Sequence, residues 1–249
     1  MRYFLYIAYK GTHYHGWQSQ PNAISVQSVV TSALNTVLRG QFEIVGSGRT
    51  DTGVHARQQV AHFDFDGELD LPIIKSKLNG VLPFDISVMD IKSVSNEAHA
   101  RFDAIDRSYE YFIHHHKSPF GSNESSFVPT IPDLELMNSA SNLLLGEHDF
   151  QSFSKVKTEV NNFKCTVTKA EWKKLDDGAV FHITANRFLR GMVRTIVGTL
   201  LDIGHGKQSR EDLAAILQAK NRSSAGRSVS ADGLYLCRIN YPETIFNKP

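Results

Sequence analysis

The chain has 249 residues, which is enough to bury a substantial core in one domain or in two fused halves. Its 27 basic and 26 acidic residues leave a formal net charge of +1, which excludes a strong overall attraction to nucleic acid, so any basic surface has to be local. The two cysteines, Cys165 and Cys237, favour a reduced intracellular protein over a disulfide framework. The apolar run Met1–Tyr9 is too short for a secretory signal or a membrane span, so we expect cytoplasmic residence.

Strand and helix patterns alternate in the first part of the chain. Apolar positions 26, 29, 30, 33, 34, 37 and 38 keep helical spacing behind Ser25, a favourable N-cap residue. Pro72 suits the first turn of a second helix. In chain order we predict a strand ending at Tyr9, a helix from Val26, strands at Phe42–Gly46 and Val60–Phe65, and a helix at Leu71–Leu78.

The second part of the chain repeats this alternation. Tyr109, Tyr111 and Ile113 alternate with other residues as in a strand, and Ser209 with Asp212 fits a helix-capping box. We predict a helix at Ile131–Leu145, strands at Cys165–Trp172 and Val180–Ala185, a helix with an apolar stripe from Met192 to Leu201, a helix after Ser209, and a strand at Leu234–Tyr241. The runs His114–His116 and Ser223–Gly226 are expected to be short loops.

Helices interspersed with strands of mixed spacing predict an α+β fold in which helices cover one face of largely antiparallel sheets. Trp17 and Trp172 are expected to be buried aromatic residues.

The stretch Gly46–Ala56 is the most informative part of the sequence, because it places Asp51 beside Arg49 in a loop of small residues between two apolar runs. Thr50 and Thr52 are positioned to hydrogen-bond the carboxylate. A lone aspartate in such a loop suggests nucleophilic or acid–base chemistry, although an ordinary turn fits the same residues. A phosphate-binding loop is disfavoured, since neither the third glycine nor the Gly-Lys-Ser/Thr sequence is present.

A series of short motifs follows in a fixed order along almost the whole chain. The motifs are Tyr9-Lys10-Gly11-Thr12, Gly16-Trp17-Gln18, Ser25-Val26-Gln27, Gly48-Arg49-Thr50-Asp51 with Gly53-Val54-His55-Ala56, His99-Ala100-Arg101-Phe102, Arg107-Ser108-Tyr109-Glu110-Tyr111, His148-Asp149-Phe150, Ser152-Phe153, Gly191-Met192-Val193-Arg194 and Gly233-Leu234-Tyr235-Leu236. This series resembles the TruA-type tRNA pseudouridine synthases. The resemblance departs at Thr52, where the family more often has alanine, and at Leu189-Arg190-Gly191, where the residues before Met192 vary.

The resemblance implies two ferredoxin-like halves, residues 1–104 and 105–249, that form a mixed, mainly antiparallel sheet with helices on one face and an RNA-binding cleft on the other. It implies a homodimer that isomerises uridines 38, 39 and 40 in the anticodon stem-loop of tRNAs. Neither a metal nor a small-molecule cofactor is implied, and no membrane partner is expected.

By the same resemblance, Asp51 is the nucleophile, Arg194 forms an ion pair with it, Tyr109 stacks on the target base, and Arg49 positions the target nucleotide. The residues alone leave alternatives open. Arg194 also fits a solvated arginine at a helix border, and Arg49 fits a phosphate clamp or a loop salt bridge. The tyrosines at 109 and 111 also fit cross-strand core positions, and attack at C1′ or at C6 is equally consistent with a carboxylate nucleophile.

A local basic surface is predicted from stretches that contain no acidic residue. Residues 186–201 carry Arg187, Arg190 and Arg194, and residues 161–169 carry Lys164 and Lys169. We assign RNA binding to Arg57, Arg187, Arg190 and Lys164, whereas a plain solvated face remains the alternative.

Other functions fit the sequence less well. The histidines lack the His-Glu-x-x-His or Cys-x-x-Cys spacing of metal sites, and His55 is interpreted as a residue that packs the Asp51 loop. A non-catalytic RNA-binding protein would not require Asp51. A carboxylate glycosidase needs a second acid, for which Asp103, Glu110 and Asp149 are available but fit surface or strand-edge charges better.

Overall fold

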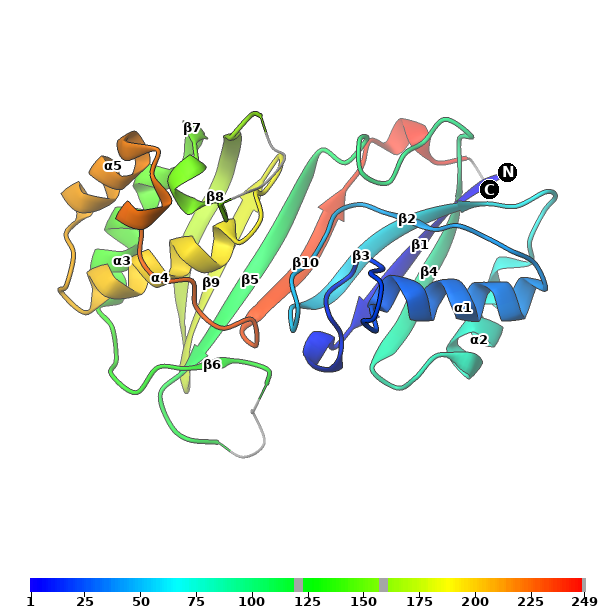
Figure 1. Cartoon of the computed structure of the whole chain (residues 1–249), viewed down its shortest axis with the longest axis horizontal. Helices are drawn as coiled ribbons and strands as arrows, with labels where there is room; N and C mark the ends of the chain where they lie inside the picture. Colours follow the sequence, from blue (N-terminus) through cyan, green and yellow to red (C-terminus); the bar gives the residue numbers. More distant parts are fainter. Residues whose placement is uncertain (119–122, 157–160, 248–249) are drawn as a thin grey trace. The chain divides into compact units, whose positions relative to one another are not determined.

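The computed structural model describes residues 1–118, 123–156 and 161–247, drawn in Figure 1. Two compact units are present: Met1–Ile105 together with Leu236–Pro249, and Asp106–Tyr235. Both combine helices with mainly antiparallel strands, which confirms the predicted α+β class. Residues 236–247 belong to the first unit. The functional division into residues 1–104 and 105–249 stays a prediction.

The first unit is a sheet with the strand order β4-β1-β3-β10, in which the short strand β2 also pairs with β3. The pairings of β1 with β3 and with β4 are antiparallel. Its elements are β1 (Arg2–Tyr9), the 3-10 turn η1 (Gly11–His13), α1 (Val26–Leu38), β2 (Val45–Gly46), β3 (His55–Asp64), α2 (Leu71–Val81), β4 (Ile86–Val94), β10 (Leu234–Asn240) and η5 (Glu243–Ile245).

Local capping signals define both helices of this unit. The Ser25 side chain accepts a hydrogen bond from the Ser28 amide at 3.1 Å, and the reciprocal contact completes a capping box, so the predicted N-cap is confirmed. Asp70 caps α2 ahead of Pro72, as the proline predicted. The helices pack against each other, and α2 packs against β4.

The core of the first unit lies on both faces of β1. Phe4, Leu5 and Ile7 are fully buried, as is Trp17 in the loop that follows η1. Since successive side chains of a strand alternate between its faces, one layer of helices cannot cover all of them. Tyr241 covers Phe4, with ring centroids 5.1 Å apart, so residues after β10 complete this core.

The second unit is a sheet with the order β5-β9-β8-β7, antiparallel throughout, with β6 added in parallel to β5. Helices α3 and α4 pack together, and α3 packs against β8. Its elements are β5 (Asp106–His114), β6 (Ser126–Phe127), α3 (Leu134–Ser141), η2 (Asn142–Leu144), β7 (Gly146–Asp149), η3 (Gln151–Phe153), β8 (Lys164–Leu175), β9 (Gly178–Ala185), α4 (Met192–Gly204), α5 (Arg210–Ala219) and η4 (Arg222–Ser224).

The predicted apolar helix and the predicted capping box of this unit are both confirmed. The α4 side chains from Met192 to Leu201 are buried with few exceptions, and Ser209 forms the capping box of α5 with Asp212. Trp172 is buried, as expected, and its ring packs on that of Phe181 with the centroids 5.1 Å apart. None of the helices in the described residues is long and apolar enough to cross a membrane.

Several predicted bounds were wrong for identifiable reasons. The helix predicted at Ile131–Leu145 begins only after Asp133, whose carboxylate accepts from the Glu135 and Leu136 amides, and it ends in the η2 turn. The strand predicted at Phe42–Gly46, before the Asp51 loop, covers only Val45–Gly46. The strand predicted at Val60–Phe65, after the loop, begins earlier, at His55. The predicted loop Ser223–Gly226 overlaps the η4 turn.

Candidate active site

Asp51 lies in the loop 47–54 that joins β2 to β3, and its side chain is half-buried. The Ser47 amide donates to the Val60 carbonyl at 2.8 Å and thereby fixes the start of the loop. The Val54 amide donates to the Asp51 carbonyl at 3.1 Å and closes its end. Asp51 therefore begins a short turn closed by a hydrogen bond, in a loop whose first residue is tied to the sheet.

A buried polar group supports the first half of this loop. The Ser47 hydroxyl donates to Gln59 Oε1 at 2.5 Å, and Gln59 Nε2 donates to the Gly48 carbonyl at 3.2 Å. Ser47 and Gln59 are both almost completely buried, so these hydrogen bonds replace the water that the groups lose on folding. Next to this rigid support Arg49 is exposed, and within the described residues it makes no ion pair.

The segment 9–17, which starts at the last residue of β1, also contacts the loop. The Tyr9 and Thr50 hydroxyls are hydrogen-bonded at 2.8 Å in a buried position, and the Trp17 amide donates to the Thr50 carbonyl at 3.3 Å. A Cβ atom on Gly11 would stand 2.0 Å from the Val54 carbonyl oxygen, so only glycine allows this approach. Tyr9, Gly11 and Trp17 all belong to motifs identified in the sequence, and the structure explains their spacing by contact with one loop.

The two threonines beside Asp51 differ from the expectation drawn from the sequence. The Thr50 hydroxyl bonds Tyr9, and Thr52 is exposed. Neither threonine side chain bonds the Asp51 carboxylate in the part of the chain that the structure describes. Thr50 therefore secures the backbone of the loop, and the exposed Thr52 side chain fits the place where the family more often has alanine.

His55 begins β3 and is buried, with 1% of its surface exposed, which confirms its interpretation as a packing residue of the loop. Its Nδ1 atom accepts a hydrogen bond from the Gly11 amide at 3.0 Å. Arg57 follows two residues later on β3, and its side chain is exposed.

Tyr109 and Tyr111 both lie on β5, but the structure gives them different environments. Tyr111 is fully buried and donates its hydroxyl to the Ser230 carbonyl at 3.0 Å, so it belongs to the core. Tyr109 is half-buried opposite Ile183, and its ring meets Phe188 edge to face with centroids 5.0 Å apart. Of the two rings, Tyr109 is the one that remains accessible to a ligand.

Arg194 occupies the first turn of α4 and is held by residues after α5. Its Nε atom donates to the Val229 carbonyl at 2.7 Å, and its own carbonyl accepts from the Val229 amide at 3.2 Å. Burial raises the pKa of Tyr111, and the positive charge of the nearby Arg194 opposes that rise. Two hydrogen bonds between Arg194 and the Val229 backbone therefore hold this arginine in place, unlike a solvated surface arginine.

Residues 227–229, which include the anchor of Arg194, pack closely against α4. The Thr195 and Ser228 hydroxyls are 2.8 Å apart, and a Cβ atom on Gly198 would stand 1.8 Å from the Arg227 carbonyl oxygen. Sequence reasoning missed Gly198, Ser228 and Val229. The only available signal was a glycine inside a strongly apolar helix, which often marks close approach of another chain segment.

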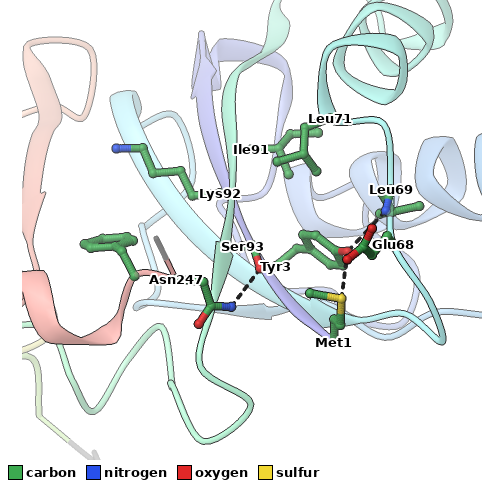
Figure 2. A pocket seen from close by; sticks show the side chains of 10 residues that line it. Met1, Tyr3, Glu68, Leu69, Leu71, Ile91, Lys92, Ser93 and Asn247 are labelled. Atoms are coloured by element: carbon green, nitrogen blue, oxygen red, sulfur yellow. Dashed lines mark hydrogen bonds between the residues drawn. The ribbon is translucent and has the colours of Figure 1, made fainter. Parts of the chain in front are cut away.

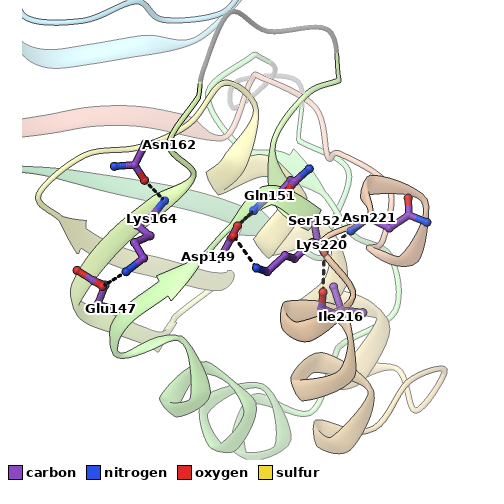
Figure 3. Close-up of polar contacts among 9 residues, drawn as sticks. All are labelled: Glu147, Asp149, Gln151, Ser152, Asn162, Lys164, Ile216, Lys220 and Asn221. Atoms are coloured by element: carbon purple, nitrogen blue, oxygen red, sulfur yellow. Dashed lines mark hydrogen bonds and ion pairs between the residues drawn. The ribbon is translucent and has the colours of Figure 1, made fainter.

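The predicted RNA-binding residues of the second unit have unlike surroundings. Arg190 is exposed and Arg187 is half-buried. Lys164 Nζ lies 3.0 Å from Glu147 Oε1 on β7 (Figure 3), and this carboxylate raises the pKa of the lysine. Strand pairing thus brings an acid to a stretch that has none in its sequence.

The residues weighed for other functions have structural partners. Asp103 accepts from the His99 amide at 2.7 Å, Glu110 lies 3.3 Å from His182, and Asp149 lies 3.4 Å from Lys220 (Figure 3). No cluster of three or more metal-ligating side chains occurs within residues 1–118, 123–156 and 161–247.

A pocket of about 390 Å³ lies at the other end of β1 from the Asp51 loop (Figure 2). Its lining includes Tyr3, whose hydroxyl donates to the Gly67 carbonyl and accepts from the Leu69 amide, each at 3.2 Å. Asn247 on its rim donates to the Ser93 hydroxyl at 2.8 Å. The Tyr3 contacts join β1 to the segment before α2, and the Asn247 contact joins the residues after η5 to β4. The pocket contains none of the predicted site residues.

Comparison with known proteins identifies the family to which this chain belongs. A family profile described as tRNA pseudouridine synthase matches residues 5–103 and 140–242. The chain therefore belongs to the tRNA pseudouridine synthase family. The matched ranges contain Arg49, Asp51 and Arg194, whereas Tyr109 lies between them.

Curated relatives extend this match to nearly the full length. The chain is 49% identical to the tRNA pseudouridine synthase A of Bacteroides fragilis over 247 residues, which cover 98% of each protein. It is 46% identical to that of Porphyromonas gingivalis over 98% of this chain and 99% of the relative, and 42% identical to that of Bacillus licheniformis over 97% and 99%. A chain of a solved Cbf5-Nop10-Gar1 complex is 10% identical with a TM-score of 0.33, over 80% of this chain and 54% of that one, which is too distant to inform the fold.

Proposed function

We propose that this protein isomerises uridine to pseudouridine in tRNA with Asp51 as the nucleophile. Family membership and 49% identity over 98% of the chain support the reaction. The observation that carries the role of Asp51 is its position on a turn fixed from both sides, by the sheet and by the segment 9–17. Preorganisation of this kind is what a nucleophile requires.

The reaction breaks the bond between C1′ and N1, turns the detached uracil while it stays trapped, and joins C5 to C1′. An ionised Asp51 attacks either C1′ of the ribose or C6 of the base, and both routes lead to a covalent or glycal-type intermediate. The C5 hydrogen leaves as a proton and N1 gains a proton, so the isomerisation involves no net oxidation and needs no redox cofactor.

The carboxylate must stay charged in a site that excludes water, where desolvation alone would raise its pKa. In our proposal Arg194 supplies the compensating charge as an ion-pair partner of Asp51. Support comes from its anchoring by the Val229 backbone, which holds the guanidinium in one place. An arginine fixed in this way loses less side-chain entropy when it forms an ion pair than a mobile one does.

Base flipping precedes the chemistry and costs a few kcal/mol of lost stacking. We assign stacking on the flipped uracil to Tyr109, because it is the accessible ring of the two on β5. Arg49 positions the target nucleotide, and Arg57, Arg187, Arg190 and Lys164 contact the phosphate backbone. To contact a phosphate, the Lys164 ammonium has to break its ion pair with Glu147 or bind both groups at once.

The substrate we propose is the anticodon stem-loop of tRNAs, with uridines 38, 39 and 40 as targets. The enzyme acts as a homodimer in the cytoplasm, built from two ferredoxin-like halves with an RNA-binding cleft on the sheet face opposite the helices. Cys165 and Cys237 form no disulfide in the described part of the chain, which agrees with a reducing compartment. The non-catalytic RNA-binding alternative is not favoured, because it gives no reason for the fixed loop around Asp51.

Substitution of Asp51 tests the proposal directly. We expect Asp51→Asn and Asp51→Ala to lower isomerisation by at least ~10⁴-fold, because the nucleophile is removed, while tRNA binding largely survives. Unmodified tRNA transcripts are incubated with each protein, and pseudouridine is located by carbodiimide-dependent primer extension. Retained turnover in either variant would exclude Asp51 as nucleophile, and modification outside positions 38–40 would exclude the proposed target.

A further inference from the structure

A ring of hydrogen bonds leads from His55 back to the residue two positions after Asp51. His55 Nδ1 accepts from the Gly11 amide at 3.0 Å, and the Gly11 carbonyl accepts from the Tyr14 amide at 3.0 Å. The Tyr14 carbonyl then accepts from the Gly53 amide at 3.3 Å. The first link joins the segment 9–17 to the start of β3, the second closes the η1 turn within the segment, and the third joins the segment to the loop that carries Asp51.

The first link is the only one in this ring made by a side chain. The ladder between β1 and β3 ends at the pair Tyr9 and Ala56. The Lys10 amide donates to the Asp85 carbonyl at 2.9 Å, and the Gly11 amide lies one residue further on, beyond the last strand pair. Gly11 is buried at the start of η1, where a backbone N–H has no partner within the turn. The imidazole of His55 supplies the acceptor for the Gly11 amide.

The geometry also determines the form of the imidazole. Because the backbone amide of Gly11 is a donor, Nδ1 has to carry a lone pair, and the ring proton is on Nε2. Since His55 is 1% exposed, water cannot replace the acceptor when it is lost.

We propose that His55 is a positioning residue for Asp51, and that its Nδ1 lone pair is the feature that matters. This inference rests on the proposed function, in which Asp51 is the nucleophile. Through Gly11, η1 and Tyr14, the lone pair fixes the Gly53 amide, and with it the turn that ends at the hydrogen bond between Val54 and Asp51. Loss of the acceptor leaves a buried N–H without a partner and allows the turn to shift.

Two isosteric substitutions separate the nitrogens of the ring. Asn carries its Oδ1 atom at the position of Nδ1, whereas Gln places its amide one bond further out, at the position of Nε2. We expect His55→Gln to lower the single-turnover rate of isomerisation roughly 10–100-fold, because a displacement of about 1 Å is enough for such a loss. We expect His55→Asn to retain most of the rate.

The rate is measured as tritium release from transcripts labelled at C5 of uridine, with enzyme in excess over tRNA, and the dissociation constant for tRNA is measured in parallel. Both variants should bind tRNA as the unchanged protein does. The inference is overturned when Gln retains the rate and Asn loses it, when the two variants lose it equally, or when binding weakens in place of the rate.

A measurement on the unchanged protein covers the case in which a variant does not fold. In protein with ¹⁵N-labelled histidine and glycine, His55 Nδ1 should resonate as an unprotonated nitrogen with a coupling to the Gly11 amide. A protonated Nδ1 would refute the inference. Asp51→Asn serves as the reference for function: if this variant isomerises uridine, the proposed function fails, whereas an inactive Asp51→Asn beside a fully active His55→Gln refutes only the role of His55.

Discussion

His62 is a histidine held neutral in the core of the first unit. Its side chain on β3 packs beside Phe4 and against His99, with the two imidazole centroids 4.7 Å apart, and its Nδ1 accepts from the Ala100 amide at 3.2 Å. Burial lowers the pKa of His62 to about 4, and the positive charge of Arg2 acts in the same direction. Protonation would remove the acceptor that holds Ala100.

This environment makes stability dependent on pH. The unfolded chain takes up the proton near the ordinary pKa of 6.5, whereas the folded protein resists it down to about 4. Stability contributed by the neutral ring is therefore complete above pH 6.5, falls as the pH is lowered, and reaches its minimum below pH 4. The loss amounts to at most about 3 kcal/mol.

We expect His62→Asn to weaken this dependence, because Asn keeps an acceptor at the Nδ1 position and does not titrate. Urea unfolding of both proteins at several pH values between 7 and 4 measures the effect. The difference in unfolding free energy between them should shrink as the pH falls. A constant difference across this range would contradict the assignment to His62.

At the scale of single residues, the sequence predicted side chains whose role depends on near neighbours. Ser25 was identified as a cap because it directly precedes a run with helical spacing, and Ser209 because Asp212 lies three residues away. Tyr109 and Tyr111 could not be distinguished, because the burial of Tyr111 depends on Ser230, 119 residues later. For the same reason the sequence did not reveal Val229 as the anchor of Arg194.

Among the elements, α4 depends on a glycine at the point where another segment crosses it. A Cβ atom on Gly198 would push Arg227 away, and Val229 two residues later holds Arg194. We expect Gly198→Ala to destabilise the protein by about 1–3 kcal/mol through overpacking. It should also lower the isomerisation rate by a larger factor than it lowers the affinity for tRNA, because the Arg194 guanidinium loses its anchor at Val229.

Gly80 in α2 provides a matched control for this substitution. It is also a helical glycine, but no atom lies within 4 Å of the position of its Cβ. Gly80→Ala should leave the rate unchanged and raise stability by up to about 1 kcal/mol, since alanine is the better helix former. Equal effects of the two substitutions on thermal unfolding and single-turnover rate would show that the contact with Arg227 is unimportant.

Strands were harder to predict than helices, and β4 shows why. Its pairing with β1 shifts register between Tyr6 and Ile7, and the exposed pair Met89 and Asp90 interrupts the alternation of buried residues. The strands β6 and β7 are short, and their sequences carry no apolar alternation. Such strands form because a neighbouring strand is available, which no local pattern records.

At the scale of the whole molecule, the net charge of +1 means that tRNA binding relies on individual cations. Each phosphate contact adds about 0.9 to the slope of log binding constant against log salt concentration for duplex nucleic acid. We expect Arg190→Gln to weaken binding at low salt and to reduce this slope by about one. Fluorescence anisotropy with labelled tRNA across a series of KCl concentrations measures both quantities.

The same measurement tests the pairing of Lys164 with Glu147. Because Glu147 already partners the ammonium, Lys164→Gln should reduce the slope by less than the value of about 0.9 expected for one full phosphate contact. Glu147→Gln should tighten binding at low salt by releasing the lysine. A slope that no substitution alters would argue against phosphate contacts at these residues.

The packing of residues 236–247 with the first unit sets the order in which the protein can be completed as it leaves the ribosome. Residues 106–235 form one uninterrupted stretch, so this unit is fully synthesised first. The sheet that supports Asp51 has to wait for β10 and for Tyr241, whose hydroxyl binds the Ala100 carbonyl. The nascent chain thus carries an incomplete first unit until after residues 106–235 have emerged.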